Sequence, residues 1–546
     1  MGILRETLAE RILREREVIW KEHRLWEPIW QEISELVYPR RGNVASNIIS
    51  GEQRTRRLFD STAVVAATRL AAAIAGTVTP STTQWFDFDL PQTSAAMIPK
   101  VVVDYAQGTA TALFDILQRT NFSVELQEVY HDLVTFGTAA VFITENDGLP
   151  TFRALHPSEY AIWTDSGGRV TKLVRDIRMT IREAMVEFGA ENLAPDMLRI
   201  ISENGDVDQH FIFTQWVAYR NDEPIGFPVD NFPVASIYVD ATHHHVVKKS
   251  GFYEWPCPVV RWAATSGESY GRSPAFDALP DVASLNKAEE FGLRAWALAV
   301  MPPLLAVNDG VLGKPDLRPA RMTFVHSDKS LMWFPPNTKL DVETVKRDDK
   351  RRAIWNTFFM DQVQFVPERG KTPPSAEEVR ARLNIMLQIL GPTLSRTDYE
   401  LHLPLLGRAY GIASRSGRLP APGPAVVSAA SRIGNELQVQ FVGPIARAKR
   451  QAESQKLDNA LNAIAVAAQV DPQTTDVVNL DEWVRTKLDI EMIPRNLLRT
   501  RKEVADLRKV RAEQAAQQRQ MEMMQGMAQA GGAIAPLVKE ANAERG

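Results

Sequence analysis

The sequence contains almost no cysteine and no long apolar run. Among its 546 residues Cys257 is the single cysteine, which excludes an intramolecular disulfide and a cysteine metal cluster and favours an intracellular setting. No stretch approaches the roughly 18 consecutive apolar residues of a membrane-spanning helix. The charged beginning, MGILRETLAERILRERE, lacks the apolar core of a signal peptide. We therefore expect a soluble protein that is made in the cytoplasm and has no membrane partner.

The sequence also lacks an excess of charge of either sign. Its 63 basic and 67 acidic residues leave a formal net charge of −4, and the mean hydropathy is −0.21. Binding to nucleic acid through bulk charge depends on neutralising phosphates. The balance therefore argues against a protein that grips DNA, but not against DNA that passes by without sticking. A chain of this length is expected to form about two to four substructures.

Motifs for cofactors and metals are missing as well. No GxGxxG, P-loop or H-E-x-x-H pattern occurs. Adjacent side chains in the triplet His243, His244 and His245 would point to opposite faces of an extended segment, which suits a solvated loop better than a metal site. Asp348 and Asp349 lie within KRDDKRR, which predicts a helix face of mixed charge. We expect no cofactor and no metal.

One pattern does match a catalytic motif. GESYG, residues 267–271, fits the G-x-S-x-G nucleophile elbow, with a strand-like run before it and a helix-like run after it. A serine hydrolase would use Ser269, which a fluorophosphonate probe would label. However, the later histidines, His326 and His402, have no evident role, and antiparallel-looking strands stand where such enzymes need βαβ units. We keep the hydrolase as an alternative and predict that the protein is not an enzyme.

Hydrophobic periodicity divides the first half of the chain into a helical and a β-rich part. Short runs rich in β-branched and aromatic residues predict strands between residues 139 and 262. Three- and four-residue spacings of apolar residues predict helices over residues 5–38, 61–75, 101–118 and 124–136. The expected fold class is therefore α+β and mainly helical.

Two helical stretches bracket a short mixed segment in the middle of the chain. Helices are predicted over residues 273–300 and 342–364, with a small proline-rich αβ piece between them, so that the two helices form a stalk with a tip. A further long helix should run over residues 375–414 with a bend at Gly391-Pro392. The last 120 or so residues are predicted to be helical, ending in a Gln/Met/Ala-rich tail.

The segment VQFVPERGKTPPSAEEVRARL joins two of these predicted helices. Its loop carries Glu368, Arg369 and Lys371 between prolines, and Ser375 with Glu378 has the spacing of a capping box, which specifies the start of the next helix. A catalytic loop, a phosphate cradle and a structural lever are three interpretations of this segment. Because no catalytic partner is evident, we favour a stiff lever with polar tips, and one copy of it would bind nucleic acid only weakly.

Several stretches together carry a resemblance to a known family. In chain order they are RRLFDSTAVVAATRLAAAIAGTVTPSTTQWFDF, LVTFGTAAVFITE with RALHPSEYAIWTDSGGRV, GESYGRSPAFDALPDVASLNKAEEFGLRAWALAVMPPLL, KTPPSAEEVRARLNIMLQILGP and VQFVGPIARAKR. Their order and spacing, from about residue 5 to residue 450, resemble the portal (head-to-tail connector) proteins of short-tailed, podovirus-type bacteriophages. One departure is PPSAEE, where members of the family often carry Thr-Ala before the glutamate, so that the loop here would be stiffer.

The resemblance implies a portal-type fold. Its expected parts, in chain order, are an α/β wing over residues 1–272, a descending stem helix over 273–300, a small αβ clip over 301–341, an ascending stem helix over 342–364, a channel loop over 365–374, a long wing helix and linker over 375–425, and a helical crown over 426–546, with a helical barrel or tail. In such a fold GESYG marks the start of the stem, and Ser269 is structural.

The resemblance also implies a function. Portal proteins form a dodecameric ring at one capsid vertex, through which double-stranded DNA passes without sequence specificity. The ring takes part in head assembly, terminase docking during genome packaging, tail or adaptor attachment and DNA ejection. The expected partners are therefore other copies of the chain, DNA, terminase, tail adaptor proteins, the capsid and scaffolding protein, in a virion whose proteins are made in the host bacterial cytoplasm. The alternative is another structural ring or scaffold component of the virion that has no DNA channel.

The resemblance assigns site residues by their place in the fold. The assigned residues fall into four groups: channel-loop residues near DNA, Glu368, Arg369 and Lys371; stem charges expected to face the channel, Lys346, Arg347, Lys350 and Arg351; clip residues that contact terminase or the adaptor, Trp333, Phe334, Pro335 and Pro336; and the helix cap, Ser375 and Glu378.

Overall fold

The computed structural model describes residues 7–45, 51–89, 100–203, 205–220, 232–300, 304–306, 331–333, 340–363, 385, 389–424, 426–428, 438–443, 454, 456–466, 478–490, 499, 503–518 and 520–521. The chain divides into two units. Unit 1 comprises Met1–Phe86, Ala110–Ala421 and Phe441–Lys449, and unit 2 comprises Asp87–Thr109, Pro422–Gln440 and Arg450–Gly546. Helices and small antiparallel sheets give a mixed α+β fold in which helix predominates, and the predicted fold class is confirmed at that level.

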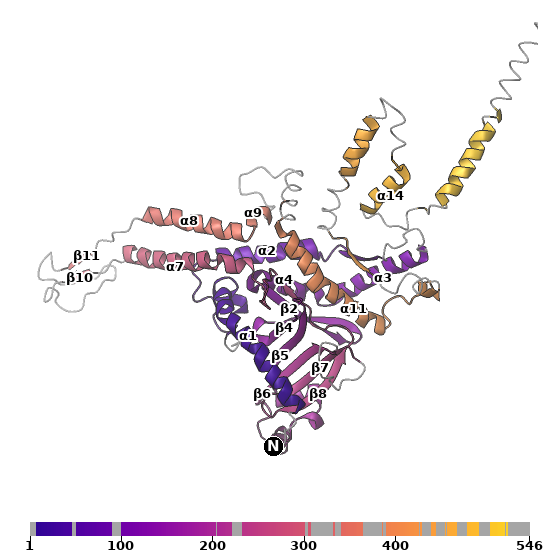
Figure 1. Ribbon diagram of the computed structural model, residues 1–546. Helices are drawn as coiled ribbons and strands as arrows, with labels where there is room; N and C mark the ends of the chain where they lie inside the picture. The colour runs from indigo at the N-terminus through magenta and orange to yellow at the C-terminus, as the bar shows by residue number, and fades with distance from the viewer. Residues whose placement is uncertain are drawn as a thin grey trace, which may run out of the picture. The chain divides into compact units, whose positions relative to one another are not determined.

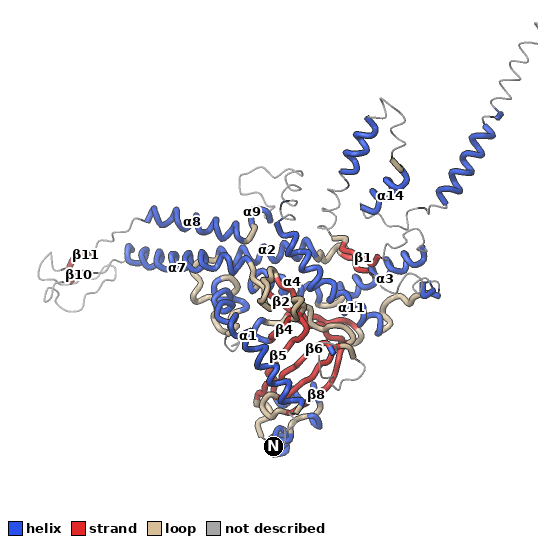
Figure 2. The backbone as a smooth tube through the Cα atoms, viewed as in Figure 1, coloured by secondary structure: helices blue, strands red, loops and turns tan. Residues whose placement is uncertain are grey.

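The largest sheet of unit 1 has five antiparallel strands in sequence order (Figure 2). They are β4 (Tyr160–Thr164), β5 (Val170–Thr180), β6 (His210–Tyr219), β7 (Val234–Asp240) and β8 (His245–Phe252). Two short helices, α5 (Ile181–Phe188) and α6 (Pro195–Ser202), lie in the chain between β5 and β6. The predicted β-rich region thus forms mainly one antiparallel meander. Its two faces are available for other elements to pack against.

Helix α1 (Leu8–Leu36) covers one face of this sheet. It begins at a capping box, because Thr7 accepts a hydrogen bond from the Glu10 N–H and Glu10 accepts one from the Thr7 N–H. The apolar positions of its first turns recur at helical spacing and pack against inward-facing residues of β4 to β7. The main residues of this core are Ala9, Ile12, Ile19, Trp20, Ala161, Val174, Trp216, Ala235 and Ile237.

A second layer of unit 1 joins helices to a three-stranded sheet of order β3-β2-β9. Its elements are α2 (Thr62–Val78), α4 (Phe122–Phe136), β2 (Thr138–Asn146), β3 (Leu149–Ala154) and β9 (Val259–Arg261). Gly137 ends α4 with a φ of 75° and turns the chain directly into β2. A Cβ there would lie 2.4 Å from the carbonyl oxygen of Gly271, so both glycines are needed where these two segments cross.

Two long helices of unit 1 lie side by side (Figure 1). They are α7 (Pro274–Val300) and α8 (Leu340–Thr357), and the chain between them contains the antiparallel pair β10 (Leu304–Ala306) and β11 (Leu331–Trp333). The prediction of two helices around a small mixed segment is consistent with these elements. The second helix is interrupted, however, because Phe359 has a φ of 57° and a short helix α9 (Met360–Val363) follows it.

The long helix expected over residues 375–414 is described from residue 389 onward, together with Ile385. Gly391 and Pro392 are both helical, and the irregular turn lies further on, in the π-helical segment η6 (Asp398–His402). Helix α11 (Leu403–Arg415) continues from it. The irregularity therefore falls one to two turns after Pro392, and the helix runs unbroken through Gly391 and Pro392, where the bend was predicted.

The remaining short elements of the described residues are η1 (Pro39–Arg41), η3 (Pro157–Glu159), η4 (Ala190–Asn192), β1 (Phe86–Asp89), α3 (Lys100–Gln118) and β12 (Gln438–Phe441). Unit 2 contains α14 (Leu480–Ile490) and helical residues 456–466 and 503–518. Within it, Arg508 pairs with Asp481 at 2.5 Å. A search of the described helices for one long and apolar enough to span a membrane finds none.

Candidate functional site

The α7–α8 hairpin, formed by residues 274–300 and 340–357, is held together by a row of ion pairs. Asp281 and Glu289 lie eight residues apart on α7, about two helical turns, so their side chains share one face. On α8, Arg347, Lys350 and Arg351 are spaced by three and four residues and also share a face. The mixed charges predicted for the stalk thus form an acidic stripe on α7 that faces a basic stripe on α8.

The distances show that Glu289 is the centre of this row. Its Oε2 lies 3.1 Å from Nη1 of Arg347, and its other carboxylate oxygen pairs with Arg351. Arg351 also reaches Oδ2 of Asp60 at 3.1 Å, and Nζ of Lys350 lies 2.9 Å from Oδ1 of Asp281. The side chains of Glu289 and Arg347 are only 16% and 15% exposed, so the Glu289–Arg347 pair is shielded more than an ordinary surface pair.

A second set of contacts ties the beginning of the hairpin to the body of unit 1. The side-chain oxygen of Asn286 accepts hydrogen bonds from the N–H groups of Phe59, at 2.7 Å, and Asp60, at 3.2 Å. Its amide nitrogen donates to the carbonyl of Arg57 at 2.9 Å. The Arg57–Asp60 segment is therefore fixed on α7, which places the Asp60 carboxylate within reach of Arg351. Burial opposes the charge of Arg351, but these carboxylates raise its pKa above the ordinary value.

Other faces of the hairpin are open to solvent in the single chain. On α7, Phe291, Leu293 and Trp296 are 52%, 52% and 63% exposed. On α8 the side chain of Arg352 is largely exposed, with Asp349 at 3.9 Å as an ion-pair partner. Large exposed apolar groups beside charged ones are typical of a surface that another protein covers.

The structure describes the four predicted stem charges and the backbone of Trp333. Arg347, Lys350 and Arg351 point across to α7 and its neighbours, while Lys346 is exposed and makes no ion pair with any described residue. Trp333 is the last residue of β11, known by its backbone alone. The predicted residues outside the described ones are Phe334, Pro335, Pro336, Glu368, Arg369, Lys371, Ser375 and Glu378.

The GESYG motif occupies a turn and not a nucleophile elbow. An irregular stretch separates β9 from α7, which begins at Pro274. Ser269 is buried, and its Oγ lies 3.2 Å from Oγ1 of Thr164. The downstream His402 uses both ring nitrogens elsewhere, with the Tyr130 hydroxyl and an Asp398 oxygen each at 2.8 Å, whereas His326 lies outside the described residues. The motif is explained by packing, because Gly271 must pass close to Gly137.

The histidine triplet also has a structural place. Residues 241–244 form the turn between β7 and β8, and His244 has a φ of 52°. Nδ1 of His243 lies 2.5 Å from Oδ2 of the buried Asp240, which accounts for that carboxylate. Within the described ranges, no group of three or more histidine, cysteine or carboxylate side chains is arranged to hold a metal ion.

Sequence reasoning missed a buried polar cluster between α1 and α4. Asp132 is buried beside Arg41, with 3.4 Å between Oδ2 and Nη2, but its Oδ1 has no hydrogen-bond partner among the described residues. Burial outweighs Arg41 and raises the pKa of Asp132 to about 7. Burial also lowers the pKa of His131, which stacks on Tyr38, and of His156 to about 4 each. These residues carry no motif or spacing that would have singled them out.

A helical hairpin held by ion pairs, with large apolar side chains exposed on its outer faces, is suited to building an assembly. The protein is therefore of the structural, assembly-forming class. The chain belongs to the bacteriophage head to tail connecting protein family, whose model matches residues 9–498.

Two relatives carry portal names. The chain is 26% identical over 516 residues to a probable portal protein of Bordetella phage BPP-1, covering 91% of this chain and 90% of that protein. It is 23% identical over 534 residues to the portal protein of Salmonella phage epsilon15, covering 96% and 95%. The portal function predicted for the chain is confirmed, and the chain is a component of the head-to-tail connection of a virion.

A solved structure is also similar, at a lower level. A chain of the virion of a native gene transfer agent particle matches with a TM-score of 0.31 and 13% identity, covering 76% of this chain and 91% of that one. The family assignment depends on the sequence match over residues 9–498 and on the two phage relatives.

Proposed function

We propose that twelve copies of the chain form a ring at one capsid vertex and that double-stranded DNA passes through its centre. In this ring the α7–α8 hairpin is the stem, residues 301–341 are the clip and residues 365–374 are the channel loop. The ring nucleates head assembly, docks terminase during packaging and later holds the tail adaptor. Membership of the head-to-tail connecting family is what carries the proposal.

The exposed apolar side chains of α7 support assembly through this hairpin. Phe291, Leu293 and Trp296 are each more than half exposed in one chain. Burying such side chains removes apolar surface from water, which contributes roughly 25 cal/mol per Å². A neighbouring hairpin in the ring would cover them, and aromatic residues are commonly the anchors of such interfaces.

The ion pairs of the hairpin support passage of DNA without gripping. Arg347, Lys350 and Arg351 are already neutralised by carboxylates of the same chain. A cation that is already paired with a carboxylate gains less interaction free energy from an approaching phosphate. A channel lined by these helices would therefore attract DNA weakly. The exposed Lys346 is the described stem cation that we propose to lie nearest to the DNA.

Electron microscopy of the purified protein tests the ring directly. We expect rings with a central hole, and a ring or other particle without a hole would favour a structural component that has no DNA channel. Trp296→Glu should leave a folded chain that no longer forms rings, whereas Trp296→Phe should keep them. Rings of normal abundance with Trp296→Glu would contradict the proposed stem interface.

The channel loop is tested by packaging. We propose that Arg369 and Lys371 approach the DNA and that the loop acts as a mobile constriction. A double variant, Arg369→Ala with Lys371→Ala, should change the packaging rate or the retention of packaged DNA. The proposal fails if packaged length, packaging rate and retention all stay as in the unmodified particle.

The clip is tested by docking. We propose that Trp333, Phe334, Pro335 and Pro336 contact terminase first and the tail adaptor later. Rings carrying Trp333→Ala with Phe334→Ala should bind terminase more weakly in a pull-down while keeping their ring shape. Unimpaired docking by those rings would remove the clip from the interface.

A further inference from the structure

The five-stranded sheet of unit 1 has an open edge along part of β5. On one side β5 pairs with β6 as far as Thr180, which lies opposite His210. On the other side its pairing with β4 ends at Arg175, opposite Tyr160. Among the residues that the structure describes, residues 176–180 therefore have a neighbouring strand on one side only. Such an edge presents backbone groups that an additional strand can pair with.

The backbone of Arg178 points toward this open side. Thr180 marks the alternation, because its N–H donates to Oε2 of Glu183 at 2.8 Å instead of to β6. In an antiparallel strand, backbone groups two residues apart point the same way. The N–H and C=O of Arg178 are thus directed away from β6. They are the groups that a further strand would meet first.

An open groove of about 1160 Å³ runs along this edge. Its walls come from β5, from α5 and from Val44 and Ala45. Val186 of α5, which is 87% exposed, offers an apolar contact in the groove. A groove beside an unpaired strand edge has the form that extended peptides occupy.

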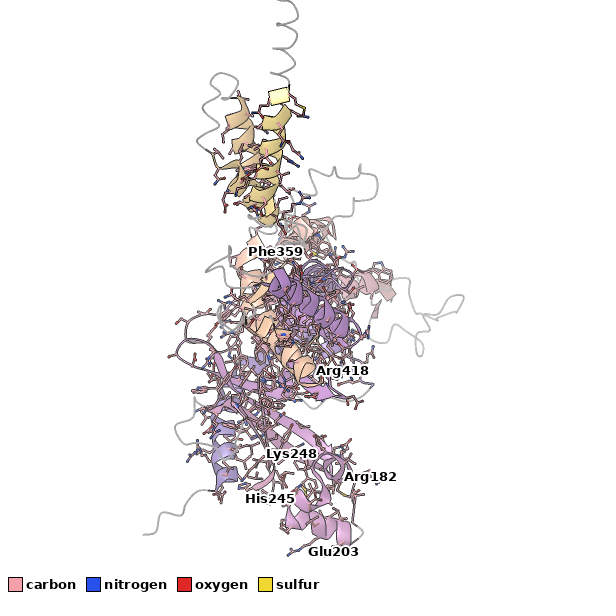
Figure 3. The ribbon with its side chains drawn as sticks, turned by 90° about the vertical axis from the view of Figure 1, so that its right-hand side faces the viewer. Arg182, Glu203, His245, Lys248, Phe359 and Arg418 are labelled. Atoms are coloured by element: carbon pink, nitrogen blue, oxygen red, sulfur yellow. The ribbon has the colours of Figure 1, made fainter. Side chains whose placement is uncertain are left out.

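The acidic residues of the groove already have partners in this chain. The acceptors and their partners are Asp176 with Arg16 at 2.9 Å, Glu159 with Arg153 at 3.1 Å, Glu183 with the N–H of Thr180 at 2.8 Å, and Glu187 with Lys248 at 3.7 Å. Lys248 and Arg182, which pairs with Asp208 at 3.2 Å, are labelled in Figure 3. These carboxylates are therefore not available to a partner, and neither are these four cations.

Two arginines of the groove have no carboxylate partner among the described residues. Arg175 is 5% exposed, and its Nη1 donates to the Gln215 amide oxygen at 3.2 Å while its buried Nε has no acceptor. Its guanidinium lies over the ring of Phe142, at 4.5 Å from the centroid. Arg178 is exposed and lines the same groove. Arg175 and Arg178 are three residues apart in β5, so their side chains project from opposite faces of the sheet. Arg178 is therefore the arginine of the two that a peptide added at the open edge can reach.

We propose that the open edge of β5 binds an extended, acidic peptide segment of a partner protein, which adds as a strand and pairs its carboxylates with Arg178. The peptide supplies the backbone that Arg178 faces and the carboxylate that its guanidinium lacks among the described residues. A nucleic acid would supply the anions without the strand, and the charge-balanced walls offer no wider basic surface for a phosphate backbone. Specificity comes from alternate side chains of the peptide, one of which lies against Val186.

Fluorescence anisotropy of labelled peptides on the full chain tests this proposal. The probe is a peptide of about ten residues in which valine and glutamate alternate. Its comparison is the same peptide with lysine in place of glutamate. We expect binding of the acidic peptide that weakens as salt is raised, and roughly tenfold or weaker binding of the basic one.

Variants separate charge from backbone. Arg178→Glu should weaken the acidic peptide by roughly tenfold or more, since it replaces a charge-assisted contact with a repulsive one. Arg178→Pro should weaken it as strongly, because it also removes the outward N–H. Arg199→Glu, on the exposed side of α6, is the matched control and should leave the affinity unchanged. Unfolding curves that match the unmodified chain confirm that each variant is folded.

Three results would overturn the proposal. The first is equal affinity for the acidic and the basic peptide, or an affinity that Arg178→Glu does not change. The second is a short DNA duplex that binds with the same dependence on Arg178, which would assign the groove to nucleic acid. The third is that the assembled protein binds no peptide and that Arg178→Pro blocks assembly. This combination would assign the edge to a second copy of this chain.

Discussion

At the scale of single residues, the buried polar cluster between α1 and α4 makes stability depend on pH. Asp132 and the two histidines His131 and His156 are all held near their neutral forms by burial. The directions are opposite for acid and base. Native Asp132 keeps its proton up to about pH 7, above the range where the unfolded chain loses it, so its contribution to the stability of the native state falls as pH rises. The native histidines stay neutral down to about pH 4, so their contribution falls as pH falls.

His156 is the residue on which this can be measured. The unfolded state binds its proton below about pH 6.5, but the native state does so only below about pH 4, so the native state loses stability as pH falls through that window. At pH 5 the loss is about 2 kcal/mol. His156→Asn keeps an acceptor for the N–H of Ser158 and removes the titration. Urea unfolding at pH 7 and pH 5 should show a smaller fall for the variant by about that amount.

A fall in stability between pH 7 and pH 5 that is the same in both proteins would contradict this assignment. The opposite contribution of Asp132 is present in both proteins and cancels in the comparison, which is why the histidine is changed and the carboxylate is left in place.

Position 137 requires glycine, because a side chain there would clash with the backbone of Gly271. Gly137→Ala should destabilise the chain by roughly 3 kcal/mol or prevent folding, since it combines a φ of 75° with a Cβ placed 2.4 Å from the Gly271 carbonyl oxygen. Gly407→Ala is the control, because Gly407 lies inside α11 with nothing within 4 Å of its Cβ position. That change should stabilise by about 0.5–1 kcal/mol. Thermal unfolding and soluble yield measure both, and equal behaviour would refute the crossing argument.

At the scale of elements, the charges of α7 and α8 first serve their own hairpin. The predicted stem charges Arg347, Lys350 and Arg351 pair with carboxylates of α7 that lie 58 to 69 residues away in the chain. A helix face can present one stripe of charge to a neighbouring helix and another to solvent. Lys346 and Arg352 belong to the exposed part of α8.

Two neighbouring glutamates of α7 separate the two kinds of ion pair. Glu289 pairs across to α8, whereas Glu290 pairs with Lys287 and Arg294 of its own helix. Glu289→Gln should lower the free energy of unfolding by about 1–3 kcal/mol, because the shielded guanidinium of Arg347 loses this carboxylate and Arg351 is left with Asp60 and Asp348. Glu290→Gln should change it much less, because its pairs lie within one helix and are open to solvent.

Urea unfolding of the full chain measures the two glutamine variants. Added salt should reduce the effect of Glu290→Gln more than that of Glu289→Gln, since exposed pairs are screened more strongly. Equal losses for the two variants would show that the cross-helix pairs do not hold the hairpin together.

At the scale of the whole molecule, a charge balance of −4 with paired stem charges predicts weak contact with DNA. Assembled rings should bind duplex DNA no more tightly than ordinary non-specific binding, about 10⁻⁴–10⁻⁶ M at physiological salt. Asp349→Lys, on the exposed side of α8, should tighten binding and slow packaging because it adds positive charge to the proposed stem surface.

The matched control for Asp349→Lys is Glu203→Lys, which makes the same change of charge at an exposed residue beyond α6 (Figure 3). It should leave DNA binding and packaging nearly unchanged. If both variants tighten DNA binding equally, net charge and not the hairpin decides the affinity. Titration of labelled duplex at several salt concentrations distinguishes the two outcomes.

Much of the secondary structure could be predicted from the sequence, because helix and strand formation depends on neighbours in the chain. The spacing of Ile12, Ile19 and Trp30 predicted α1, and the β-branched runs predicted the strands around β6. The break before α9 was not predicted, because Phe359 is neither glycine nor asparagine and nothing local signals its φ of 57°.

The sequence by itself determined the class of the fold, the two helices of the hairpin and the resemblance to portal proteins, since periodicity, charge balance and motif order are all local or additive properties. Only the tertiary structure decided that Glu289 holds both Arg347 and Arg351, that Gly271 must be small because Gly137 crosses it, and that β5 outruns β4 and leaves Arg178 facing outward. These facts depend on which distant residues meet, and the pairing of distant residues is set by the packing of the whole chain.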